Sequence, residues 1–231
     1  MIRVPYHEQI NAYTCGPASL MMAMASLEPT RKPDQMMELA LWREATTIFM
    51  TSGHGGCHPL GLALAAQRRG FHAEVTMNTR NPLFVEGVRH EKKKDILIKV
   101  DRQFLKEAKA GGVSLHYGDV TQQQIEAWIN EGWAVLVLIS TYRLDGKKTP
   151  HWVCITGSDE HCFYVHDPDC EEGKQLALDC QHLPIARADF AKMSAFGRGR
   201  LRTAIILRKA DGPEVERRVS DGERRVRGSS E

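Results

Sequence analysis

The chain has 231 residues, of which 42% are hydrophobic and 26% charged, and its formal net charge is +2. This composition is typical of a globular protein with one main domain, and so small a net charge argues against a nucleic-acid partner. No early segment has the pattern of a signal peptide, and the longest apolar run, residues 133–139, is far short of the roughly 20 residues that span a bilayer, so we expect a cytoplasmic protein with no membrane partner.

The first half of the chain is predicted to be mainly helical. Residues 2–6 read as a short opening strand, which Pro5 would confine to a sheet edge. Three helices follow, of which the first is apolar on nearly all sides and should be buried. Their expected ranges are 16–27, 33–45 and 58–69. After a strand at 71–77, residues 80–118 are predicted to hold a polar irregular segment, a short helix that ends at Gly111 and a strand at 113–120.

The second half is predicted to be mainly strands. Thr121, with Gln124 three residues later, indicates the capped start of one further helix, and a continuous apolar run at 133–140 suits a central strand. A hairpin and a closing strand are expected next, at 151–157, 161–167 and 202–209. Helices first and mostly antiparallel strands afterwards indicate the α+β class. We expect one domain over residues 1–208 and a charged, mobile tail over 209–231.

The hairpin predicts a pair of functional side chains. If its loop is residues 158–160, partner residue numbers add to 318 and His151 faces Asp167. Facing side chains on adjacent strands are close enough for a carboxylate to accept a hydrogen bond from an imidazole. A histidine held in this way is an oriented base whose second nitrogen can accept a proton from a nucleophile.

Cys15 is the candidate nucleophile. The six cysteines are too sparse and irregular for a disulfide framework, so reduced thiols are expected. Cys15 lies at the predicted start of the first helix, where the helix dipole and free N–H groups favour a thiolate and can hold an oxyanion. The side-chain amide of Gln9, six residues earlier, would supply a second oxyanion donor.

The segments "QINAYTCGPASL", "HWVCITG" and "YVHDPD" together resemble the papain-like cysteine peptidases, and most of all the bacteriocin-processing, double-glycine leader peptidases and their stand-alone relatives. The resemblance implies an N-terminal helical part packed on a C-terminal antiparallel sheet, with the active site between them. It also implies that Cys15 is the nucleophile, His151 the base, Asp167 the orienting acid and Gln9 the oxyanion donor. No cofactor and no metal are required, and the partner is a peptide or protein substrate.

Several alternatives stay open at this point. Cys15 and His151 could be packing residues, and Asp169 could replace Asp167. Zinc could bind one of two clusters, which are His161, Cys162, His166 and Cys170, or His54, Cys57 and His58. The glycine-rich residues 51–59 could line the cleft or form a plain surface loop. The same site could also transfer an acyl group to an amine or thiol, or survive only as a peptide-binding groove. Neither the substrate sequence nor the oligomeric state follows from these patterns.

Overall fold

The computed structural model describes residues 3–47, 55–86, 88–146, 149–170 and 175–210. Its helices are α1 (Cys15–Leu27), α2 (Gln35–Ala45), α3 (Pro59–Gln67), α4 (Glu91–Gly111), α5 (Gln122–Asn130), α6 (Tyr142–Asp145) and α7 (Arg187–Met193). Its strands are β1 (Phe71–Met77), β2 (Ser114–Tyr117), β3 (Ala134–Ser140), β4 (Pro150–Ser158), β5 (Cys162–His166), β6 (Leu183–Ala186) and β7 (Thr203–Lys209). Within these described ranges, no helix is both long enough and apolar enough to cross a membrane.

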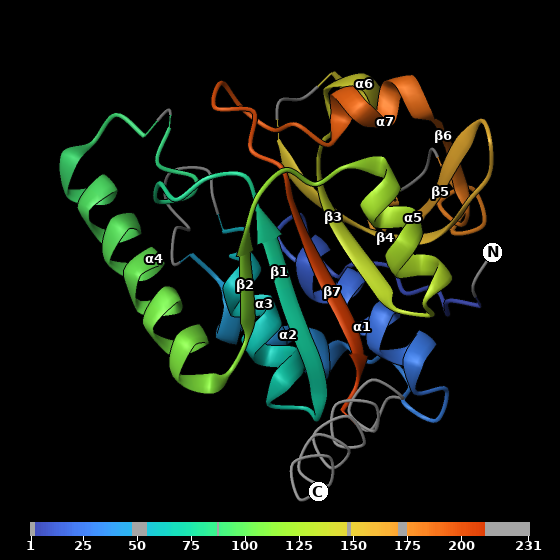
Figure 1. Cartoon of the computed structure of the whole chain (residues 1–231), viewed down its shortest axis with the longest axis horizontal. Coiled ribbons are helices and arrows are strands. Elements are labelled where there is room, and N and C mark those ends of the chain that lie inside the picture. The colour runs from blue at the N-terminus through green and yellow to red at the C-terminus, as the bar shows by residue number, and fades with distance from the viewer. Residues whose placement is uncertain (1–2, 48–54, 87, 147–148, 171–174, 211–231) are drawn as a thin grey trace, which may run out of the picture.

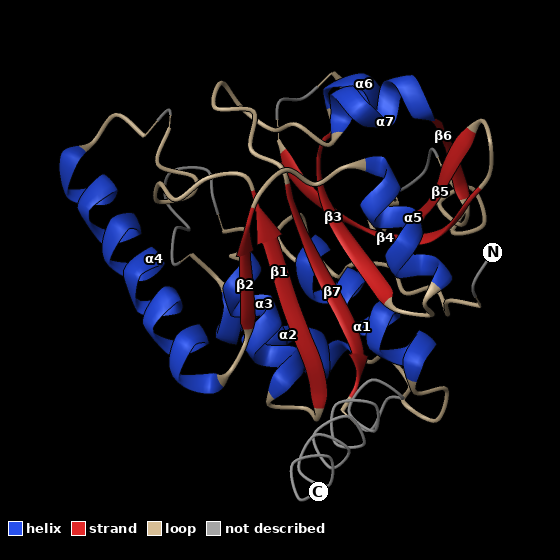
Figure 2. Cartoon of the chain, in the orientation of Figure 1, coloured by secondary structure: helices blue, strands red, loops and turns tan. Residues whose placement is uncertain are grey.

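The strands form one sheet in the order β2-β1-β7-β3-β4-β5-β6, in which only the β1–β2 pair is parallel among the described strands. Helices cover both faces of this sheet (Figures 1 and 2). The mixed layout with its mostly antiparallel sheet confirms the expected α+β class.

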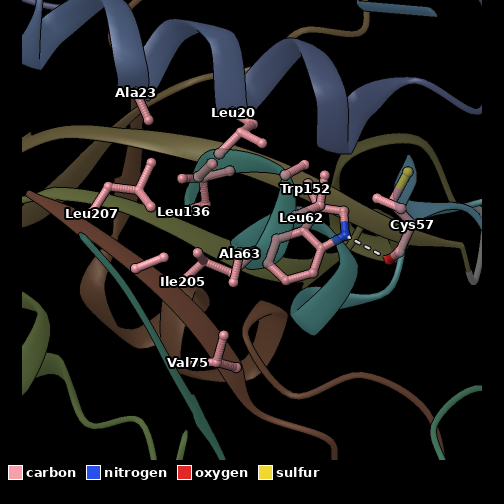
Figure 3. Packing of buried hydrophobic residues seen from close by; sticks show 14 of the residues in the cluster. Leu20, Ala23, Cys57, Leu62, Ala63, Val75, Leu136, Trp152, Ile205 and Leu207 are labelled. Carbon is pink, nitrogen blue, oxygen red and sulfur yellow. Dashed lines mark hydrogen bonds between the residues drawn. The ribbon is translucent and has the colours of Figure 1, made fainter. Parts of the chain in front are cut away.

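The two faces of the sheet bury two separate hydrophobic clusters. Alternate residues of β3 divide between them: Leu136 lies in the cluster that includes α1 and α3, whereas Val135 lies in the cluster that includes Ile125 of α5 and Phe190 of α7. Figure 3 shows the first cluster, with Leu20 of α1 above Leu136 of the sheet. Because successive side chains of a strand point to opposite faces, a fully apolar strand such as β3 must be covered on both.

The helix α1 is buried along most of its length, as its uniformly apolar sequence predicted. It packs against β3 and β4, and the Ser19 hydroxyl donates a 3.0 Å hydrogen bond to the Trp152 carbonyl of β4. This bond fixes the position of α1 along the strand that carries His151. The predicted helix boundaries of α2 and α3 and the capping box of α5 at Thr121 and Gln124 are also confirmed.

Three expectations about the fold were wrong. Residues 3–6 form no strand, and the Val4 carbonyl is bound by a histidine side chain instead of a sheet partner. The helix α4 begins at Glu91 and not near residue 101, because pairs such as Lys94–Glu91 and Lys99–Asp95 stabilise its charged first half while Leu97 begins its buried face. The last strand in the sequence, β7, was expected to close the sheet, but it lies inside the sheet between β1 and β3.

The predicted domain boundary at residue 208 stays a prediction. The strand β7 runs to Lys209, and residues 211–231, on which most of the predicted tail falls, lie outside the described residues.

Candidate active site

Cys15 is the first residue of α1 and is 6% exposed. A tight turn precedes it, in which the Thr14 hydroxyl donates to the Asn11 carbonyl at 3.0 Å and the Tyr13 N–H donates to Asn11 Oδ1 at 2.9 Å. The first intrahelical bond of α1 runs from the Ala18 N–H to the Thr14 carbonyl. The N–H groups of the first turn of a helix have no acceptor within the helix. Among the described residues, no backbone carbonyl outside the helix accepts a hydrogen bond from the N–H groups of Cys15 and Gly16 either. Both donors therefore lie beside the sulfur with no acceptor of their own.

His151 lies between Cys15 and Asp167. Its Nε2 is 2.6 Å from Asp167 Oδ1, and because an ionised carboxylate only accepts, the ring donates this bond. The Cys15 side chain lies close enough to the same ring to raise the pKa of His151. The structure therefore brings the three predicted side chains together in the series Cys15–His151–Asp167, with a hydrogen bond between the last two.

The electrostatics of this series favour a protonated ring. Burial alone would lower the pKa of His151, but the Asp167 carboxylate and the Cys15 sulfur raise it well above its usual range. His151 is 5% exposed and Asp167 9% exposed, so little water screens their interaction.

The backbone around Asp167 is fixed from several sides. Its carbonyl accepts from the Tyr6 hydroxyl at 3.0 Å, its N–H donates to the Cys180 carbonyl at 3.0 Å, and its Oδ1 also accepts from the Asp169 N–H at 2.9 Å. Asp169 therefore supports the Asp167 carboxylate through its backbone, and it is Asp167 that pairs with His151.

The predicted register of the hairpin was wrong, although the predicted contact forms. The ladder pairs Cys154 with His166, so the next residue, Asp167, falls beside Val153 and not beside His151. The hairpin loop is residues 159–161, and next to it Ser158 pairs with Phe163, three residues from the predicted register; a bulge between Ile155 and Gly157 then reduces the shift by one. The pairing of Asp167 is displaced along β4 by two residues in total. Because this number is even, Asp167 stays on the same face of the sheet as His151. Asp167 and His151 are therefore diagonal neighbours, a separation that a histidine side chain can reach.

Gln9 lies in the segment before the Asn11 turn, and its backbone N–H donates to the Pro168 carbonyl at 2.9 Å. This bond joins the N-terminal segment to the residue that follows Asp167. Its side-chain Oε1 is buried, and among the described residues it has no hydrogen-bond partner. The backbone at Gln9 is thus fixed next to the site, whereas no bond holds this atom of the amide.

The described part of the glycine-rich segment, residues 55–59, packs directly against the start of α1. A Cβ added to Gly16 would lie 3.0 Å from Leu62 Cδ1 and 3.2 Å from both Cys57 Cβ and Trp152 Cδ1, so a larger residue would require these neighbours to shift. The Trp152 indole donates to the Cys57 carbonyl at 3.3 Å (Figure 3). Burial, together with the nearby Cys15, raises the pKa of the Cys57 thiol well above its usual range, which keeps this neighbouring cysteine protonated. Residues 51–54 lie outside the described residues.

An aromatic pair borders the same end of α1. The Tyr13 and Trp42 rings stack in parallel with centroids 6.1 Å apart, and the Trp42 indole donates to the Gly55 carbonyl at 2.7 Å. Tyr13, two residues before Cys15, is 40% exposed. Its ring is therefore partly open to solvent close to the predicted nucleophile.

The alternative zinc clusters do not assemble among the residues that the structure describes, where no three histidine, cysteine or acidic side chains gather in a metal-binding arrangement. His166 donates from Nε2 to the Val4 carbonyl and accepts at Nδ1 from the His182 N–H, so both ring nitrogens have backbone partners. His58 likewise pairs with Asp101 and with the Leu60 N–H. His54 lies outside the described residues.

Sequence reasoning missed the residues that hold the predicted site in place. Tyr6 binds the Asp167 carbonyl, Glu38 binds the Ile10 N–H next to Gln9, and Trp152 binds the Cys57 carbonyl beside the start of α1. Of these, only Glu38 carries a signal in the sequence, since it is a charged residue on the face of α2 that also holds the buried Leu41 and Ala45.

Comparison with known proteins gives one family. The model described as the Peptidase_C39 like family matches residues 4–208. The peptidase domain of Streptococcus ComA, a bifunctional ABC transporter involved in a quorum-sensing pathway, is 15% identical over 90% of this chain and 99% of its own, with a TM-score of 0.45. A Bacillus anthracis protein described as a C39-like peptidase is 14% identical over 92% and 98%, with a TM-score of 0.47. A double glycine motif protease of an AMS/PCAT transporter, in complex with the leader peptide, is 15% identical over 90% and 94%, with a TM-score of 0.46. No curated protein matches the chain.

Proposed function

Because the chain belongs to the Peptidase_C39 like family, we propose that it is a cysteine peptidase that hydrolyses peptide or amide bonds through a thioester on Cys15. The family assignment confirms the resemblance to the bacteriocin-processing peptidases that the sequence motifs indicated. The observation that carries the proposal is the series Cys15–His151–Asp167 at the N-terminus of α1.

Each group has a defined part in the proposed reaction. The Cys15 thiolate attacks the substrate carbonyl carbon, and the carbonyl oxygen gains negative charge. The N–H groups at the start of α1 and the Gln9 amide donate to this oxygen. Protonated His151 then gives its proton to the amine, which departs. The acyl group remains on Cys15 as a thioester. Neutral His151 next takes a proton from water, the hydroxide attacks the thioester, and the acid leaves with the Cys15 thiolate and protonated His151 restored.

Asp167 has an orienting part in this scheme. Its bond to Nε2 directs Nδ1 towards the sulfur and stabilises the ring when it is protonated. The Tyr6, Cys180 and Asp169 contacts fix the carboxylate before any substrate arrives. No metal or cofactor enters these steps.

The first test compares the alkylation of two thiols in one molecule. Cys162 is the matched control because it is more exposed than Cys15 and begins the strand β5, so it has no helix N-terminus to favour a thiolate. At pH 6 we expect iodoacetamide to modify Cys15 at least about tenfold faster than Cys162, because alkylation follows the thiolate. Peptide mass spectrometry of the two sites measures both rates.

The second test asks whether the thiol performs hydrolysis. The parent and Cys15→Ala are incubated with a proteome-derived peptide library, and new peptide ends are counted with and without added amine. We expect cleavage by the parent alone, with hydrolysed ends. Amine-capped products in place of acids would favour acyl transfer, and equal cleavage by Cys15→Ala would disprove the proposed role of Cys15.

A further inference from the structure

Glu38 is a fully buried carboxylate in the first turn of α2, with 0% of its surface exposed. Its Oε2 is 2.7 Å from His7 Nε2, and its Oε1 accepts from the Ile10 N–H at 2.8 Å. A buried carboxylate is costly unless both oxygens are bound, and here both partners come from one short segment of the chain. The two bonded residues lie on either side of Gln9.

The backbone at Gln9 is thus held from both halves of the fold. On the helical side, Glu38 binds the residues that flank it, and on the sheet side its N–H donates to the Pro168 carbonyl at 2.9 Å. Because the buried Gln9 Oε1 has no partner among the described residues, no bond of that atom sets the orientation of the amide. The orientation depends instead on where the backbone of residues 7–10 is fixed.

We propose that Glu38 is a positioning residue that acts through Gln9, by holding its amide where the oxyanion forms. This inference rests on the proposed function, since it presumes acyl chemistry at Cys15. It adds a residue that touches neither the sulfur nor the substrate, yet governs one of the donors to the developing charge. If the role of Glu38 were only structural, it would attach the N-terminal segment to α2 and would affect no particular chemical step.

Two probe reactions at the same sulfur separate these possibilities without knowledge of the natural substrate. Acylation by p-nitrophenyl acetate passes through a tetrahedral oxyanion and needs its donors, whereas alkylation by iodoacetamide forms no oxyanion. Both reactions need the same thiolate and the same access to it. The ratio of the acylation rate to the alkylation rate therefore measures the oxyanion donors alone. Rates at Cys15 are taken as the difference from Cys15→Ala, which removes the contribution of the other five thiols.

The experiment is a double-mutant cycle of Glu38→Gln and Gln9→Ala. We expect Gln9→Ala to lower the acylation rate about 100-fold, which is the typical cost of losing one oxyanion donor. Glu38→Gln, which keeps the size of the side chain but weakens its hold on His7 and Ile10, should lower acylation about tenfold. Both variants should alkylate at the parental rate, and the double variant should acylate no more slowly than Gln9→Ala alone.

Glu44→Gln is the matched control. Glu44 is a carboxylate on the same helix that pairs with Arg68 and Arg69 and contacts no residue of the proposed site. We expect it to leave both rates unchanged. Losses that multiply in the double variant, or an equal loss of alkylation in Glu38→Gln, would overturn the positioning role while leaving Cys15 chemistry intact. A Cys15 that reacts with neither probe faster than Cys162 would instead refute the proposed function itself.

Discussion

Two buried histidines in this chain pair through Nε2 with an aspartate: His151 with Asp167 at 2.6 Å, and His58 with Asp101 at 3.0 Å. They differ at the other ring nitrogen. In His58, Nδ1 accepts the Leu60 N–H and caps the start of α3. In His151, Nδ1 has no backbone partner among the described residues, and the Cys15 thiol lies close to the ring. A histidine–aspartate pair is therefore available for proton transfer only when its second nitrogen is left without a fixed backbone partner.

The two pairs also join different parts of the fold. Asp101 belongs to α4 and additionally accepts from the Leu83 N–H at 3.1 Å, so the His58 pair attaches α4 and the preceding segment to α3. Asp167 follows β5, and the His151 pair joins the end of one strand to the start of another beside α1. The first pair stabilises the attachment of α4 to α3, and we propose that the second performs chemistry.

Matched substitutions give the largest expected difference. His151→Gln should lower p-nitrophenyl acetate acylation of Cys15 by about 10²- to 10⁴-fold, because it removes the base. His58→Gln should leave acylation per folded molecule within about twofold, but lower the free energy of unfolding by about 1–3 kcal/mol, because a buried bond is weakened. Burst kinetics and urea titration measure the two quantities. If His58→Gln lost acylation to the same extent while remaining folded, the distinction between the pairs would fail.

The pH dependence of stability sharpens the comparison with a third buried histidine, His166, which binds backbone groups through both nitrogens. Burial lowers its pKa to about 4. The unfolded chain therefore takes up a proton on this ring below about pH 6.5, whereas the folded chain resists protonation until about pH 4. The free energy of unfolding should fall by roughly 3 kcal/mol as the pH drops through this window.

Urea titrations at pH 7, 5.5 and 4 measure this effect against a variant that lacks the ring, His166→Gln. The variant should show a smaller decrease in stability over the same range, whatever its stability at pH 7. An identical pH dependence in the parent and the variant would show that His166 is not the group that titrates.

The smallest effect is expected at an exposed pair. His116 Nε2 lies 3.4 Å from Glu74 Oε2, and the His116 side chain is 60% exposed. Because solvent screens such pairs, His116→Ala should change the free energy of unfolding by less than about 0.5 kcal/mol and leave acylation unchanged. A loss of more than about 1 kcal/mol in the same titration would mean that exposure does not separate the weak pairs from the strong ones in this chain.

Local patterns predicted the parts of the fold that local physics decides. The helix start at Cys15, the Asp34 cap of α2 and the capping box at Thr121 all follow from residues within one helical turn. Only the first half of α4 was missed, because its charged sequence has little local apolar pattern and the burial of the helix comes from contact with α3. The hairpin register depended on a bulge that no short motif marks.

The sequence predicted some residues of the candidate site and not others. The resemblance to papain-like peptidases selected Cys15, His151 and Asp167, and the structure brings these three together, although their catalytic roles remain predictions. The segment "HWVCITG" marked His151, whereas no pattern marked the pairing of His58 with Asp101, which lies 43 residues away. For Glu38, the place on the buried face of α2 is a signal in the sequence, but its bonding partners, 28 and 31 residues away, could not be read from it.

The placement of tryptophans has a practical consequence. Of the four in the chain, Trp42 and Trp152 border the start of α1, where they contact Gly55 and Cys57, whereas Trp128 and Trp133 pack on the opposite face of the sheet. Indole emission is sensitive to its surroundings, so the chain carries built-in optical reporters at one end of a single helix. Replacement of Trp128 and Trp133 by phenylalanine would leave a fluorescence signal that responds to whatever enters beside the sulfur, with no added dye.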